Sequence, residues 1–180
     1  VVYMTAEFPD MRATTARWRE ACREAGLGEL YIVRVETYAD YTPPSELGCD
    51  AACEFPPHNL TIPMSRLAPD QLLERFAGAV YDYRLVAELY QRRQRPAHPL
   101  FRTVVPGWDN TARKRTQATI MRDATPESYF DWLTRAIDDT VTAAVGAIQA
   151  ELTRADPAGR ATYAANARAY LARLRVLDAG

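Results

Sequence analysis

Short apolar runs that alternate with helical patterns constrain the fold of this 180-residue chain more than any other feature. Four runs stand out, at residues 1–4, 30–36, 49–55 and 101–105, and Pro or Gly residues follow closely after most of them. Runs of this kind predict short strands buried on both faces, as in a parallel sheet covered by helices. The alternation therefore predicts an α/β protein.

The helices expected between these strands are marked by capping residues and by apolar spacing. Residues 14–25 are expected to form one helix, ended by Gly26 and Gly28. A long helix is expected from about residue 70 to about Arg93, because apolar side chains recur there at helical spacing. Thr125 and Pro126 open a third helix as its N-cap and first residue, and residues 106–124 are expected to form a loop.

The strand count suggests part of a barrel. Four parallel strands are half of a β/α barrel, which typically needs about 250 residues. We therefore expect a partial (β/α) barrel of about four parallel strands over residues 1–137. Every Trp and Phe precedes residue 139, so residues 138–180 are expected to form a separate helical hairpin joined around Ala155. An open half barrel exposes sheet edges and is expected to self-associate.

Composition excludes several classes of protein. The net charge of −1 gives no reason to expect nucleic acid as a partner. No run approaches the about 18 apolar residues of a membrane span, and no signal peptide is recognised, so a cytoplasmic location is expected. The three cysteines contain no CxxC pair, which predicts reduced thiols rather than a metal site. No cofactor and no metal are expected.

Polar and aromatic side chains follow the expected strands, at the sheet edge where parallel sheets bind ligands. Glu36 follows the second strand, and Glu54 and His58 follow the third. The fourth strand leads into PGWDNTAR at residues 106–113. Carboxylates, amides and aromatic rings together are suited to sugars, since rings stack on sugar faces and polar groups bind hydroxyls.

Each of these residues also has an alternative interpretation, in which it serves the fold and binds no ligand. Glu36 would be solvated at a strand end, and a buried Glu54 would need a charged partner. His58 would stabilise a loop after the rigid Pro56-Pro57 pair, and Asp109 and Asn110 would be turn residues that bond their own backbone. The residues alone leave these alternatives open.

The segment at residues 106–113, followed by TPESY at residues 125–129, resembles the signature of the WbsX-like family. GCDAACEFPPH at residues 48–58 is similar to that family's GFDAAVEFPPH segment, and the matches keep the family's order to about residue 137. The resemblance implies a glycoside hydrolase family 99-like barrel, related to endo-α-mannosidases, that acts on a glycan or sugar nucleotide in surface polysaccharide (O-antigen type) metabolism. It also implies a sugar site lined by Glu54, His58, Trp108, Asp109, Asn110 and Arg113.

One family feature is missing from this sequence. The related hydrolases carry catalytic carboxylates in an Asn-Glu-Trp-x-Glu-Gly motif, which does not occur here. Because glycosidic chemistry needs two placed carboxyl groups, the catalytic residues are left unassigned, with only Glu36 and Glu54 as candidates. We therefore expect a chain that binds a glycan but is not catalytic alone. The alternative is a non-catalytic sugar-binding or scaffold module completed by a partner chain.

The C-terminal tail has a resemblance of its own. Residues 155–178 resemble a helix of the solute-binding proteins of zinc and manganese ABC transporters. No histidine occurs after His98, so the metal ligands of that family are absent. A fragment of a metal-ion solute-binding protein is thus a third interpretation, and an amphipathic helix pair is the favoured one.

Overall fold

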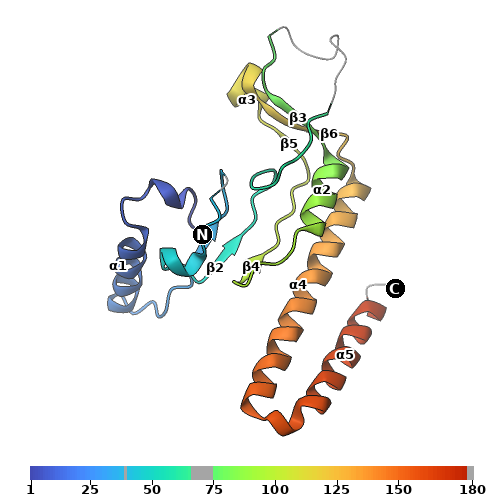
Figure 1. Cartoon of the computed structure of the whole chain (residues 1–180). Helices are drawn as coiled ribbons and strands as arrows, with labels where there is room; N and C mark the ends of the chain where they lie inside the picture. Colours follow the sequence, from blue (N-terminus) through green and yellow to red (C-terminus); the bar gives the residue numbers. More distant parts are fainter. Residues whose placement is uncertain (39, 66–74, 178–180) are drawn as a thin grey trace. The chain divides into compact units, whose positions relative to one another are not determined.

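The computed structural model describes residues 1–38, 40–65 and 75–177 of the chain (Figure 1). These divide into two compact units, Val1–Leu133 and Thr134–Gly180. The first unit contains η1 (Thr5–Glu7), α1 (Met11–Glu24), β1 (Val33–Val35), η2 (Pro44–Leu47), β2 (Ala51–Cys53), β3 (Ala79–Asp82), α2 (Tyr83–Arg92), β4 (Leu100–Phe101), β5 (Trp108–Asp109), α3 (Thr111–Lys114), η4 (Arg115–Gln117) and β6 (Thr119–Arg122). Helix α4 (Pro126–Ala155) passes into the second unit, followed by η5 (Pro157–Gly159) and α5 (Arg160–Leu177).

The first sheet consists of parallel strands in the order β1-β2-β4. Val33 pairs with Ala51, and Ala52 pairs with Leu100. Val2 adds an isolated parallel bridge to Arg34, so all four expected strand segments lie side by side in chain order. The expectation of an α/β protein with parallel strands is confirmed. The fourth strand is shorter than expected, because only Leu100 and Phe101 pair with β2.

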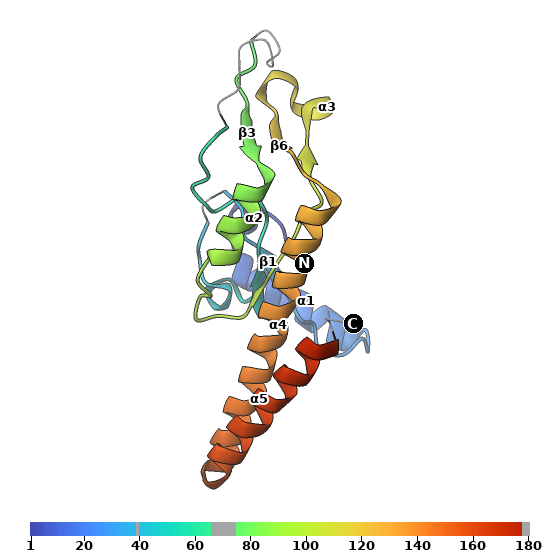
Figure 2. The same ribbon diagram turned by 90° about the vertical axis from the view of Figure 1, so that its right-hand side faces the viewer.

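The second sheet, in the order β3-β6-β5, overturns two expectations. Residues 79–82 were expected to be helical and residues 106–124 to be a loop. Instead β3 pairs in parallel with β6, and β5 pairs antiparallel with β6. Figure 2 shows β3 and β6 side by side. Residues 69–74 of the expected long helix lie outside the described residues.

The physical reason for this difference lies around Gly78 and Asp82. The backbone of Ala118 approaches Gly78 so closely that any side chain there would clash with it. The following four residues then continue the parallel ladder with β6. The Asp82 carboxylate accepts a hydrogen bond from the Leu85 amide at 3.0 Å, which caps the helix and sets its start at Tyr83. Long-range pairing therefore overrides local helical spacing.

Two apolar clusters hold the first unit together. The larger one joins α2, β6 and the beginning of α4, and its buried members are Tyr83, Val86, Ala87, Tyr90, Met121 and Trp132. The smaller one joins α1 to the first sheet through Met11, Ile32 and Cys49. Helix α1 begins three residues earlier than expected because Asp10 caps it, accepting a hydrogen bond from Ala13 at 2.8 Å.

The second unit is helical. Figure 1 shows α5 running back alongside the C-terminal part of α4. The turn between them is held by Asp156, whose carboxylate accepts hydrogen bonds from the Ala158 amide at 3.1 Å and the Tyr163 hydroxyl at 2.8 Å. These bonds explain why the direction of the chain changes just after Ala155.

Candidate functional site

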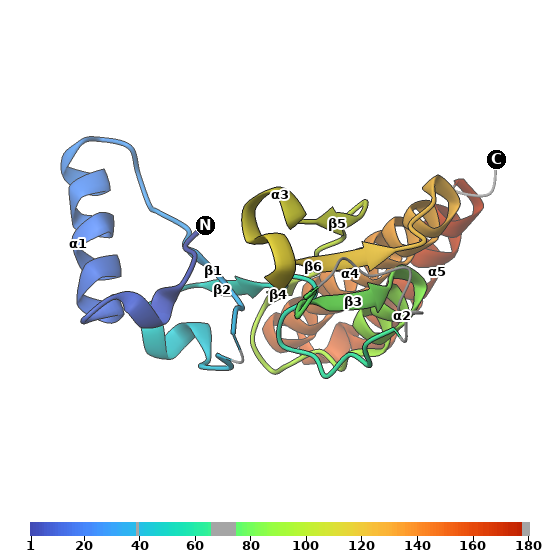
Figure 3. The same ribbon diagram turned by 90° about the horizontal axis from the view of Figure 1, so that it is seen from above.

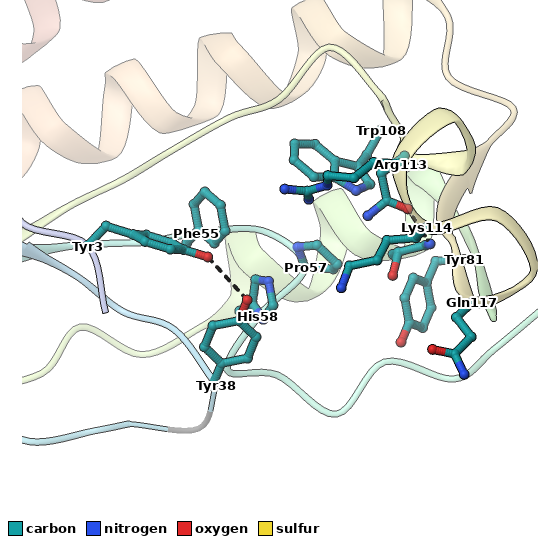
Figure 4. A pocket seen from close by; sticks show the side chains of 12 residues that line it. Tyr3, Tyr38, Phe55, Pro57, His58, Tyr81, Trp108, Arg113, Lys114 and Gln117 are labelled. Carbon is teal, nitrogen blue, oxygen red and sulfur yellow. Dashed lines mark hydrogen bonds between the residues drawn. The ribbon is translucent and has the colours of Figure 1, made fainter. Parts of the chain in front are cut away.

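A cavity of about 460 Å³ lies in the first unit, between segments that follow β1 and β2 and segments of the second sheet. Figure 3 shows α3 next to β5 and β6, the elements that provide one wall. The other wall comes from the chain after β2 and from the residues around Tyr3 and Tyr38. The lining residues are Tyr3, Tyr38, Phe55, Pro57, His58, Tyr81, Trp108, Asn110, Arg113, Lys114, Gln117 and Thr119 (Figure 4).

Aromatic rings form a connected group along this cavity. Phe55 lies at its centre, with ring centroids 5.4 Å from Tyr3, 5.1 Å from His58 and 6.5 Å from Trp108. Tyr38 contacts the other side of His58 at 4.8 Å. Burial lowers the pKa of His58 below its ordinary value, so its imidazole is neutral at pH 7. The group offers uncharged ring faces to a ligand.

Polar side chains of the segment after β5 line the same cavity. The side-chain oxygen of Asn110 accepts a hydrogen bond from the backbone amide of Thr119 at 2.7 Å, which fixes the Asn110 side chain across the turn between β5 and β6. The side-chain nitrogen of Asn110 carries two N–H groups that can donate hydrogen bonds to a ligand. Arg113, Lys114 and Gln117 are exposed and reach the cavity from α3 and η4. The cavity therefore combines apolar rings with hydrogen-bond donors.

Asp109 is placed differently from its neighbours. It is exposed, and its carboxylate accepts a hydrogen bond from the Thr111 amide at 2.8 Å. This bond lowers the pKa of Asp109. Asp109 is not among the side chains that line the cavity, and its geometry is that of a turn residue. A role for it in sugar binding stays a prediction.

Glu54 is buried beside the cavity and is held by arginines. One carboxylate oxygen lies 2.7 Å from the Arg102 guanidinium and 3.4 Å from that of Arg93. The other oxygen accepts a hydrogen bond from the Thr103 amide at 3.3 Å. Burial raises the pKa of Glu54, and the hydrogen bond from Arg102 acts in the opposite direction. The charged partner that a buried glutamate needs is thus supplied within the fold.

Glu36 shares the same cation. Its Oε2 atom forms an ion pair with the Arg93 guanidinium at 2.6 Å, between side chains that are 4% and 14% exposed. Its Oε1 atom lies 3.9 Å from Nε2 of His98, a buried nitrogen without a hydrogen-bond partner in the described part of the chain. Burial lowers the pKa of His98, which favours the neutral imidazole. Both candidate carboxylates therefore lie in one buried ion cluster around Arg93.

The structure brings together His58, Trp108, Asn110 and Arg113 from the set expected to bind sugar. Sequence reasoning missed the ion-pair partners Arg93 and Arg102. A signal for them existed, since a carboxylate inside a buried strand requires a nearby cation. It also did not assign Tyr81 or Lys114 to the site, and Tyr81 could not be assigned while its segment was expected to be a helix.

Two further findings limit what the described residues can do. They contain no group of three His, Cys, Asp or Glu side chains placed to hold a metal ion. None of their helices combines the length and apolarity that crossing a bilayer requires.

The fold and the site together define an α/β protein with a ring-lined, polar cavity next to the carboxyl ends of parallel strands, a common form of small-ligand site. The sequence profile of the family described as Glycosyltransferase WbsX matches residues 1–149. The chain belongs to this family, which confirms the resemblance of its motifs.

Relatives in two strains of Xanthomonas campestris pv. campestris carry the name uncharacterized protein WxcX. The chain is 37% identical to each over 138 residues, which cover 76% of this chain and 20% of the relative. The chain thus spans 20% of the length of these curated relatives. No solved structure matches the chain significantly.

Proposed function

We propose that this chain is a glycan-binding part of a WbsX-type protein of surface polysaccharide metabolism. The observation that carries the proposal is the cavity of about 460 Å³, in which Phe55, His58 and Trp108 lie beside the amide of Asn110. Its volume falls within the range of about 300–1,000 Å³ typical of small-ligand sites. Aromatic faces stack on the apolar faces of sugar rings, and amide and guanidinium groups bind their hydroxyls.

We also propose that the first sheet is part of a β/α barrel. Support comes from the parallel, chain-ordered arrangement of the Val2 segment, β1, β2 and β4. Further support is α1, which connects the first two of these segments as a crossover helix does.

The proposal also holds that this chain does not catalyse glycosyl transfer or hydrolysis by itself. No carboxylate is found among the described residues that line the cavity. Glu36 and Glu54 are held in the ion cluster around Arg93, where both serve as partners of a buried cation. Glycoside hydrolysis ordinarily uses two carboxyl groups that flank the scissile bond. Turnover of a glycan by the isolated chain would overturn this part of the proposal.

Titration calorimetry with mannose-containing oligosaccharides tests the binding function. The folded chain is expected to bind at least one of them with saturation, and Trp108→Ala is expected to weaken binding at least about tenfold, a loss of about 1.4 kcal/mol. Tyr31→Ala is the matched control, because this ring is 59% exposed and lies outside the cavity. Equal affinity of the Trp108 and Tyr31 variants would contradict the proposed site, and the absence of any binding by the folded chain would contradict the function.

A further inference from the structure

Two positively charged side chains line the cavity. Arg113 and Lys114 are consecutive in α3, both are exposed, and both line the cavity. Figure 4 shows their side chains on the same side of the cavity as Trp108. In the parts of the chain that the structure describes, neither one forms an ion pair with an acidic side chain.

This absence of partners is not caused by a shortage of acids. The chain has 23 acidic and 22 basic residues, so acidic residues are at least as numerous as basic ones. Arginines close to the first sheet are paired: Arg34 with Asp40 at 2.9 Å, Arg93 with Glu36 at 2.6 Å and Arg102 with Glu54 at 2.7 Å. Arg113 and Lys114 differ from these in facing a cavity whose described lining residues include no acidic side chain.

The positive charge of Arg113 acts on a side chain of the opposite cavity wall. The hydrogen bond with Tyr38 raises the pKa of Tyr3 on the opposite wall, and the positive charge of Arg113 acts in the opposite direction. This effect agrees with the place of Arg113 in the lining of the same cavity as Tyr3. An anion bound between these walls would be attracted by both cations.

We propose that the cavity binds a sugar unit that carries an anionic group, a carboxylate or a phosphate. The sugar ring lies against Trp108, and the anionic group lies between Arg113 and Lys114. A guanidinium fork binds the two oxygens of such a group together, and the neighbouring ammonium adds a second, movable donor. This inference rests on the proposed glycan-binding function and adds the chemical class of the ligand.

Calorimetry with four probes tests the inference: a mannose disaccharide, the same disaccharide with one hydroxymethyl group oxidised to a carboxylate, mannose phosphate, and inorganic phosphate. At an ionic strength of about 0.05 M, the oxidised disaccharide or mannose phosphate is expected to bind about tenfold more tightly than the neutral disaccharide. The preference should shrink several-fold at about 0.5 M salt, because exposed charges are screened there.

Arg113→Gln and Lys114→Gln are each expected to reduce this preference to about threefold or less, because each removes one of the two positive charges. Arg115→Gln removes the same charge from the next residue, which does not line the cavity, and is expected to leave the preference intact. Because all three side chains are exposed, circular dichroism should show that the variants keep the fold.

The other outcomes separate this inference from the proposed function. Equal affinity for neutral and anionic sugars, with binding still dependent on Trp108, overturns the inference alone. Binding of inorganic phosphate as tight as that of mannose phosphate also overturns it, because the cations would then hold a phosphate without recognising a sugar. Failure of the folded chain to bind any carbohydrate overturns both.

Discussion

Replacing Arg102 by Met should destabilise the first unit by more than an ordinary loss of an ion pair. The side chains of Arg102 and Glu54 are 8% and 1% exposed, and their charged atoms lie 2.7 Å apart. Without Arg102, Glu54 keeps Arg93 at only 3.4 Å and the Thr103 amide at 3.3 Å. Removing one partner of a buried pair costs about 3–5 kcal/mol, because the other charge remains buried without compensation.

Arg92→Met is the matched control for this change. Arg92 pairs with Glu88 one helical turn away at 2.5 Å, but these side chains are 75% and 48% exposed. Such a pair contributes only about 0.3–0.5 kcal/mol. In urea unfolding, where stability changes by about 1–3 kcal/mol per molar denaturant, Arg102→Met should lower the midpoint by more than about 1 M. The Arg92 variant should lower it only slightly.

The double change of Arg102→Met with Glu54→Gln isolates the charge effect. A neutral amide in place of the carboxylate no longer needs a counterion, so the double variant should be more stable than Arg102→Met alone. If Arg102→Met and Arg92→Met cost the same within about 0.5 kcal/mol, burial does not determine the strength of this pair, and the reasoning is wrong.

Two further predictions concern pH and a turn. Burial lowers the pKa of His58 below 6.5, so its contribution to stability is complete above pH 6.5 and is lost as the pH falls through the lower pKa of the folded state. Between pH 7.5 and 5.5, the free energy of unfolding in urea should therefore fall less steeply for His58→Gln than for the parent chain, by up to about 1.4 kcal/mol per pH unit; identical slopes would contradict this. Gly48 has a φ of 71°, and an added Cβ would meet the Thr15 hydroxyl, so Gly48→Ala should cost about 1–3 kcal/mol in the same assay. Gly26→Ala has the same φ of 71° but open space around it, and it should cost less.

The parallel sheet was predictable because its information is local. Each strand of the first sheet is a short apolar run closed by a polar residue, proline or glycine, and buried parallel strands need no alternation to be recognised. The position of Glu36 and Glu54 at the same sheet edge follows from their place directly after two neighbouring parallel strands. The caps Asp10 and Asp82, which set the observed helix starts, were not identified from the sequence.

The second sheet could not be predicted because its evidence is not local. Ala79 and Val80 match a helical pattern as well as a strand, and only pairing with Thr119 and Ile120, forty residues later, makes them a strand. Short strands such as β5 have two residues each, which is too few for any periodicity to be seen. The contact of Gly78 with Ala118 has no counterpart in sequence spacing.

For the site, the sequence by itself determined the family and the residue types available at the strand ends, because the motif at residues 106–113 and the segment at residues 48–58 are long and specific. Only the tertiary structure decided which of those residues face a common cavity. In the structure, Asp109 is a turn residue, Glu54 forms an ion pair with Arg102, and Arg113 lines the same cavity as the aromatic rings. The reason is physical: the role of a charge depends on its nearest counterion and on its burial, and both depend on residues far away in the chain.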